Sequence, residues 1–274
     1  MYVGEKQKSA PPSTTIPDNL SARSILLFDL ADERPIAGQN EGDIIPIASL
    51  SKIMTGYIAL KLMNAEEKIE FSEGAVKTSG TSGNFRKGEI FSLRDLLFAA
   101  MMYSSNDAAS AMAEKIGEYL GGRDFEEKIA LAVERMNTEA KGLGMEHTTF
   151  VNPTGLDFDI NIASNYSSAK DLMKLIFATK QTPLLWDASR PKEKTIYSSD
   201  GQAHRLININ QTLARLSHAL GGKTGSTDSA QESIVLLYEF PLGHPKGLIL
   251  LGTGQGRRFQ EAENILGGLM PMLL

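Results

Sequence analysis

Apolar segments with the character of β-strands stand at both ends of this chain, and their placement constrains its fold more than any other feature. Near the C-terminus, 233–240 (SIVLLYEF) and 247–254 (GLILLGTG) are joined by the short turn PLGHPK. A connection this short favours antiparallel pairing of the two strands. Near the N-terminus, 24–31 (SILLFDLA) is predicted to be a strand, and ERPIAG (33–38) provides a turn and a possible second strand.

Most of the chain between these strands carries the apolar periodicity of helices. Helices are predicted over 49–68, 92–103, 107–120, 123–144 and 167–180, with a closing helix over 258–273. The Gly/Ser-rich stretch 77–89 is expected to be a loop. The simplest architecture is an α+β fold in which both termini build one antiparallel sheet and a helical subdomain, roughly 70–165, is inserted.

The composition is that of an ordinary globular protein and excludes several classes of function. The 274 residues are 42% hydrophobic and 22% charged, which is enough for a sizeable core. A net charge of −5 offers no basic face for phosphates, so no nucleic acid partner is expected. Because the chain has no cysteine, disulfides, thiolate metal sites and cysteine nucleophiles are excluded.

The polar start of the chain differs from the rest. Residues 1–22 are rich in Pro, Ser and Thr and are interpreted as a flexible leader, with one folded domain over 23–274. No apolar run of about 18 residues or more is present, so membrane anchoring is not encoded in this chain. The leader also lacks the apolar segment of a signal peptide.

The segment IASLSKIMTGYIAL places Ser49 three positions before Lys52 where an apolar helix begins. On a helix these two side chains share a face, and the helix N-terminus favours a developing oxyanion. Lysine can act as a base there if burial or a second cation lowers its pKa. Helix capping by the serine explains the same pattern. Other hydrolase signatures are missing, and none of the four histidines has a recognisable triad setting.

Two further stretches bear on this choice. The segment YSSNDAAS places Ser104 and Asn106 between two predicted helices, where Asn106 or Asp107 could also serve as a helix cap. The segment GGKTGSTD places Lys223 just before the C-terminal strands, where a glycine-rich turn is the simpler explanation. Each stretch is ordinary by itself.

Together, in this order, SLSK, SSN and KTG form the signature of the penicillin-recognising serine acyl-transferases. The chain resembles that superfamily, and within it the low-molecular-mass D-alanyl-D-alanine carboxypeptidases (serine peptidase family S11). The segments 147–157 (HTTFVNPTGLD), 166–176 (YSSAKDLMKLI) and 208–213 (NINQTL) are also similar to that family. The resemblance covers about residues 24–270. It implies a β-lactamase/transpeptidase-like fold with helices on both faces of the sheet, and a catalytic domain over 23–274.

The resemblance implies five catalytic residues. Ser49 would be the nucleophile, and Lys52 the base that takes its proton. Lys223 would be a second cation that lowers the pKa of Lys52 and steers the substrate carboxylate. Ser104 would relay a proton to the leaving amine. Asn106 would bind the substrate amide and hold Lys52 through a hydrogen bond.

The resemblance also implies how substrate binds and reacts. The backbone N–H groups of Ser49 and Ser226 would form the oxyanion hole, and Thr224, Gly225 and Ser226 would bind the peptide along an edge strand that starts at Lys223. The terminal D-alanine of a peptidoglycan stem peptide would be displaced, leaving an acyl-enzyme that water hydrolyses. β-Lactam antibiotics would acylate the same serine. No cofactor or metal is required, and the location would be the bacterial cell envelope, outside the cytoplasm.

Two departures from the family pattern raise questions about the cleft. Ser105 stands where glycine is usual and is expected to narrow the cleft. Ile209 stands where some relatives carry an arginine near the substrate carboxylate.

Four other functions are weighed against the carboxypeptidase. A DD-endopeptidase of peptidoglycan crosslinks would keep every catalytic role. A class A-like β-lactamase would need a glutamate in an E-x-x-L-N stretch, which is absent. A non-catalytic peptidoglycan-binding module would not need all three motifs, and in an unrelated structural protein they would be accidental.

Overall fold

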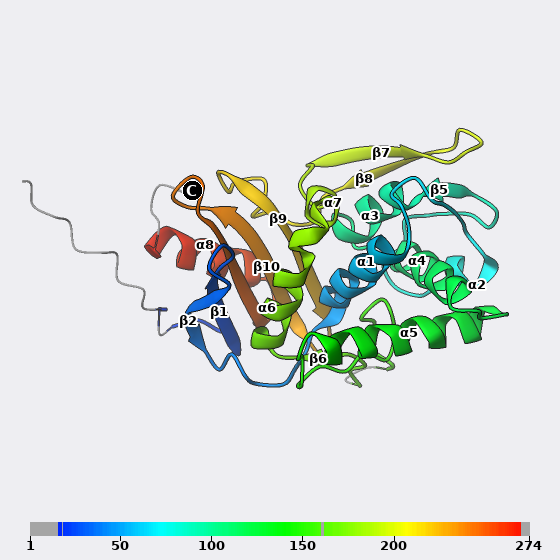
Figure 1. The fold of residues 1–274 in the computed structure, drawn as a ribbon. Helices are drawn as coiled ribbons and strands as arrows, with labels where there is room; N and C mark the ends of the chain where they lie inside the picture. Colours follow the sequence, from blue (N-terminus) through cyan, green and yellow to red (C-terminus); the bar gives the residue numbers. More distant parts are fainter. Residues whose placement is uncertain (1–15, 18, 160–161, 270–274) are drawn as a thin grey trace, which may run out of the picture.

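A five-stranded antiparallel sheet lies at the centre of the computed structural model, which describes residues 16–17, 19–159 and 162–269 (Figure 1). The strand order is β2-β1-β11-β10-β9. The strands are β1 (Ser24–Asp29), β2 (Arg34–Gln39), β9 (Ala219–Thr227), β10 (Gln231–Glu239) and β11 (Pro245–Thr253). Ser24 in β1 lies opposite Leu251 in β11, so the two ends of the chain share one sheet, as predicted.

Alternate side chains of the sheet enter two separate hydrophobic clusters, because successive residues of a strand point to opposite faces. In β10, Ile234 and Leu236 join the cluster under α8 (Arg258–Leu269), whereas Val235 and Leu237 join the larger cluster on the other face. Both faces are covered, and this explains why these strands are apolar at almost every position.

The larger cluster continues from the sheet into the helical part of the molecule. The remaining helices are α1 (Ser51–Leu62), α2 (Glu73–Val76), α3 (Leu93–Met101), α4 (Asn106–Tyr119), α5 (Phe125–Gly142), α6 (Ala169–Ala178) and α7 (Pro183–Asp187). Every residue of α1 from Ser51 to Ala59 is buried, so this helix lies inside the cluster. Figure 1 shows α4 and α2 on the side of α1 away from the sheet, with α3 above α1 and α5 running below it. The predicted fold class, with helices on both faces, is confirmed.

The short strands were mostly not predicted from the sequence. The predicted helix over 49–68 is wrong at its end, because α1 stops at Leu62 and β4 (Lys68–Glu70) pairs with β5 (Ile90–Ser92). A hairpin of β7 (Glu193–Tyr197) and β8 (Ala203–Ile207) was also missed. A further pair joins β3 (Ile45–Pro46) to β6 (Tyr166–Ser167). The 3-10 turns are η1 (Ala48–Leu50) and η2 (Thr179–Gln181).

The predicted leader falls largely outside the described residues, which omit 1–15 and 18. Its last residues belong to the folded domain, because Leu20 packs against the cluster under α8. Glu261 in α8 also accepts hydrogen bonds from the backbone N–H groups of Ser21 and Ala22. The domain boundaries and the inserted subdomain remain predictions. No helix within the described ranges is long and apolar enough to cross a membrane.

Candidate active site

Ser49 sits in η1, and tight backbone packing fixes the position of this turn. Ala48 has a left-handed backbone with φ of 45°. A Cβ atom on Gly155 would lie 1.8 Å from the Ala48 carbonyl oxygen, and one on Gly225 would lie 2.8 Å from that of Ile47. Only glycine allows the loop at 155 and strand β9 to approach the turn so closely. The two glycines therefore set where the serine stands.

The amine of Lys52 lies at the centre of the site and has three hydrogen-bond partners. Its Nζ lies 2.8 Å from Ser49 Oγ, 2.7 Å from Asn106 Oδ1 and 2.7 Å from the Thr154 carbonyl oxygen. Lys52 is fully buried, and the loss of water lowers its pKa from 10.5 to about 7, although the charge of Asp107 opposes this shift. An amine with that pKa can accept a proton near neutrality.

A second buried lysine makes a second contact between a lysine and a serine. Lys223 Nζ donates to Ser104 Oγ at 2.8 Å and to the Thr224 carbonyl oxygen at 2.7 Å. Ser104 has a left-handed backbone with φ of 66°. Burial, followed by the charges of Lys52 and Arg258, lowers the pKa of Lys223 well below its ordinary value. The site thus contains two lysine–serine pairs.

Asn106 connects the Lys52–Ser49 pair to the glycine-rich loop, residues 77–89. Its Nδ2 donates to the Ser79 carbonyl oxygen at 2.8 Å, which orients the amide so that Oδ1 faces Lys52. Its backbone N–H donates to the Thr81 carbonyl oxygen at 2.7 Å. The N-cap of α4 is instead Ser105, whose hydroxyl accepts from the Ala108 N–H at 3.0 Å. Ser105 is fully buried against the helix, so the expectation that it narrows the cleft is wrong.

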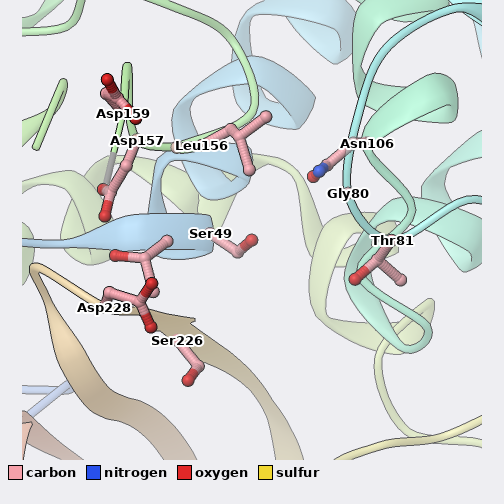
Figure 2. A pocket seen from close by; sticks show the side chains of 11 residues that line it. Ser49, Gly80, Thr81, Asn106, Leu156, Asp157, Asp159, Ser226 and Asp228 are labelled. Atoms are coloured by element: carbon pink, nitrogen blue, oxygen red, sulfur yellow. The ribbon is translucent and has the colours of Figure 1, made fainter. Parts of the chain in front are cut away.

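A cavity of about 320 Å³ opens in front of Ser49 (Figure 2). It is lined by Ser49, Gly80, Thr81, Asn106, Gly155, Leu156, Asp157, Asp159, Ser226, Thr227 and Asp228. Figure 2 shows Ser49 between Asn106 and the loop on one side and Ser226, on β9, on the other. Strand β9 is at the end of the strand order, so one of its edges has no partner strand within the part of the chain that the structure describes.

The structure brings all the predicted site residues to one place and adds others that the sequence did not suggest. Thr224 and Gly225 lie on β9 beside Lys223, and both are buried. The added groups are the Thr154 carbonyl, Asp107 and Arg258, whose Nη1 donates to the Gly225 carbonyl oxygen at 3.0 Å. A backbone carbonyl leaves no residue-type signal, and in the sequence Arg258 indicates only the start of a helix.

The comparison with known families agrees with this geometry. Residues 7–237 match the family described as D-alanyl-D-alanine carboxypeptidase. The chain belongs to the D-alanyl-D-alanine carboxypeptidase family. The sequence-based predictions of this family, and of a serine peptidase acting as a hydrolase within it, are confirmed.

Individual members of the family match the chain over most of its length. It is 33% identical to a D-alanyl-D-alanine endopeptidase of Pseudomonas aeruginosa, over 94% of this chain and 80% of that protein. It is 30% identical to one of Escherichia coli, over 97% and 84%. Among solved structures, penicillin-binding protein D2 of Listeria monocytogenes in the ampicillin-bound form is 28% identical, with a TM-score of 0.74, over 91% and 97%.

Proposed function

We propose that this carboxypeptidase family member removes the terminal D-alanine from peptidoglycan stem peptides through an acyl-enzyme on Ser49, with Lys52 as the base. The observation that carries the proposal is the set of three partners around the Lys52 amine. Two of them, Asn106 Oδ1 and the Thr154 carbonyl oxygen, can only accept hydrogen bonds. They therefore take the two N–H bonds of a neutral amine.

The third direction around Nζ then holds the lone pair of the amine and faces Ser49 Oγ. Of the three partners, the Ser49 hydroxyl is the one that can donate a proton. As Oγ attacks the carbonyl carbon, its proton moves to Lys52 and an oxyanion forms on the carbonyl oxygen. The backbone N–H groups of Ser49 and Ser226 are proposed to hold that oxyanion, and losing one such donor costs about 3 kcal/mol of barrier.

The second pair is suited to the departure of the leaving group. The Ser104 hydroxyl accepts from Lys223 Nζ and can pass its own proton to the D-alanine nitrogen as the C–N bond breaks. The proton that Lys52 took from Ser49 then replaces it on Ser104, so that Ser104 and Lys52 both return to their starting states. Arg258 supplies positive charge beside β9, where its Nη1 donates to the Gly225 carbonyl oxygen, and Thr224 offers a hydroxyl on the same strand. These groups favour the terminal carboxylate of the substrate at this end of the cleft. Water then hydrolyses the ester on Ser49 and releases the shortened peptide.

The free edge of β9 is proposed to bind the substrate backbone by strand addition. Benzylpenicillin and other β-lactams would acylate Ser49 in the same way, which fits the ampicillin-bound form of the Listeria relative. A peptidoglycan substrate places the protein in the bacterial cell envelope, outside the cytoplasm.

A DD-endopeptidase is the second candidate, because the Pseudomonas and Escherichia relatives both carry that name. The two activities use the same bond-breaking steps and differ in the group that leaves from the scissile bond. A carboxypeptidase releases free D-alanine from a monomeric pentapeptide, whereas an endopeptidase separates crosslinked dimers. Incubating the protein with both purified substrates and quantifying the products by liquid chromatography distinguishes them.

Intact-mass measurement after mixing with benzylpenicillin tests the nucleophile. We expect one covalent adduct on the wild type and none on Ser49→Ala. The matched control is Ser217→Ala, at an exposed serine that does not line the cavity, which should form the adduct as the wild type does. An adduct on Ser49→Ala would overturn the assignment. Rapid loss of the adduct with penicillin consumed would indicate a β-lactamase instead.

A further inference from the structure

Asp107 is a fully buried carboxylate in the first turn of α4, and its hydrogen bonds come from two different segments. From the glycine-rich loop, Ser82 Oγ donates at 2.7 Å and the Gly83 N–H at 3.0 Å. From its own helix, the Ala108 N–H donates at 2.9 Å, and the Ser105 hydroxyl also donates. The carboxylate thus joins the loop to the start of α4.

The joined loop forms a wall of the catalytic cavity, where Gly80 and Thr81 line it. The same loop receives both hydrogen bonds that orient Asn106, at the carbonyl oxygens of Ser79 and Thr81. A Cβ atom on Gly80 would lie 2.5 Å from Asn106 Nδ2, so the loop and the amide are packed too closely for a side chain at position 80. Movement of the loop away from Asp107 would therefore change the position of the amide that holds Lys52.

The charge of Asp107 also acts on Lys52. Lys52 and Lys223 are both fully buried, and Arg258 adds positive charge on the β9 side. Across the described ranges, Asp107 is the acidic group whose charge favours protonated Lys52, and it opposes the effect of burial on the pKa. Buried cations without a nearby carboxylate lose their proton more readily.

We propose that Asp107 is a positioning residue for this reaction: it anchors the glycine-rich loop to the start of α4 and supplies a buried negative charge that acts on Lys52. The proposal rests on the proposed role of Lys52 as the base. An acidic residue in the first turn also stabilises a helix in general, but that role alone would not change the pH dependence of acylation.

The test is the rate of acylation by benzylpenicillin from pH 5 to 9 in the wild type and in Asp107→Asn. The amide keeps an acceptor oxygen for the loop but removes the charge. Without that charge, Lys52 stays neutral at lower pH. The fall of the acylation rate on the acidic side of the pH profile, its acidic limb, should therefore move down by about one pH unit. The plateau rate should fall about tenfold, because the amide cannot satisfy all the donors around it.

Ser82→Ala is the matched control, since it removes one loop hydrogen bond and no charge. We expect its plateau rate to fall while its acidic limb coincides with that of the wild type. The proposal would be overturned if the acidic side of the pH–rate profile of Asp107→Asn coincided with that of the wild type. It would also be overturned if the profile of Ser82→Ala moved by the same amount.

If circular dichroism shows that Asp107→Asn does not fold, Asp107→Glu replaces it. Glutamate keeps the charge but has a longer side chain, so the acidic limb of the pH profile should stay in place and the plateau acylation rate should fall. An acidic limb that moves would contradict the proposal. Absence of any Ser49-dependent acylation in the wild type would instead refute the proposed function.

Discussion

At the scale of single residues, the site depends on a lysine that is costly to charge. Lys52 has no exposed surface, so its ammonium form cannot be hydrated and its pKa falls to about 7. Its three partners suit a neutral amine that donates twice and accepts once. Burial, which is usually unfavourable for lysine, is therefore the property that would suit Lys52 to its proposed role as the base.

The pH dependence of acylation follows from that pKa. Above about pH 7 Lys52 is mainly neutral and can take the Ser49 proton, whereas below it the amine is protonated. We expect the benzylpenicillin acylation rate to fall about tenfold per unit below pH 7 in stopped-flow measurements. Lys52→Arg, which cannot lose its charge, should lower the plateau at least about 100-fold, and the exposed Lys192→Arg should not. A rate independent of pH between 5 and 8 would argue against Lys52 as the base.

Gly155 offers a second test at this scale, because it packs against Ala48 in η1, the turn that carries Ser49. Its φ is 83°, and an added Cβ would lie 1.8 Å from the Ala48 carbonyl oxygen. Gly155→Ala should therefore reduce the acylation rate about 100-fold and lower the free energy of unfolding by about 2 kcal/mol. Gly142→Ala, where nothing lies within 4 Å of the added atom, is the control and should match the wild type. Unchanged acylation in Gly155→Ala would show that the turn tolerates displacement.

At the scale of elements, the β7–β8 hairpin makes a second contact with the glycine-rich loop, in addition to the contacts from α4. His204 of β8 lies with Nδ1 3.1 Å from the Gly83 carbonyl oxygen and Nε2 3.1 Å from the carboxylate of Glu89. Its ring stacks on Phe85 with centroids 4.8 Å apart. The loop is thus held by hydrogen bonds from both α4 and the hairpin.

Removing the two hydrogen bonds of His204 should make the glycine-rich loop more mobile. His204→Phe keeps an aromatic ring on Phe85 but loses both hydrogen bonds, so amide hydrogen exchange over 79–83 should become faster. The acylation rate should fall severalfold, because the loop carries the carbonyl groups that orient Asn106. Tyr197→Ala, which changes an exposed residue of the same hairpin, is the control. Equal exchange rates in the wild type and His204→Phe would show that the hairpin does not brace the loop.

Elements whose sequence signal is local were predicted, and those that depend on distant partners were not. The helix that begins at Ser51 was found, but helix-forming residues continue past Leu62, and the pairing of β4 with β5 ends it there. Strands β7 and β8 each bury a single residue, Ile196 and Leu206, which is too little for a period of two to be visible.

The candidate site divides in the same way. The motifs located Ser49, Lys52, Asn106 and Lys223, because their chemistry is carried by side-chain type and short spacing. The Thr154 carbonyl could not be found, since any residue supplies a carbonyl and the contact joins positions 102 apart in the chain. The contact of Asp107 with the loop is long-range for the same reason.

At the scale of the whole molecule, the segment just before β1 is joined to α8. Glu261 is 5% exposed and accepts from the backbone N–H groups of Ser21 and Ala22. Glu263, two positions along the same helix, pairs instead with the exposed Arg215. Glu261 therefore joins the segment before β1 to α8, whereas Glu263 is partly exposed to solvent.

These two glutamates make a matched pair for stability measurements. Glu261→Ala leaves buried N–H donors without an acceptor and should lower the free energy of unfolding by about 2–3 kcal/mol in urea. Glu263→Ala loses a partly exposed ion pair and should cost less than about 1 kcal/mol. Neither residue belongs to the catalytic machinery, so both folded variants should acylate at the wild-type rate. Equal losses of stability would show that Glu261 does not join the segment before β1 to α8.

The strand order has a consequence for the protein while it is being made. Strand β1 leaves the ribosome early, but its neighbour β11 begins only at Pro245. Ser49 and Lys52 likewise emerge long before β9 brings Lys223 and Ser226. A chain that ends before β9 therefore carries Ser49, the proposed nucleophile, without the strand that completes the cavity, so acylation requires synthesis through β9.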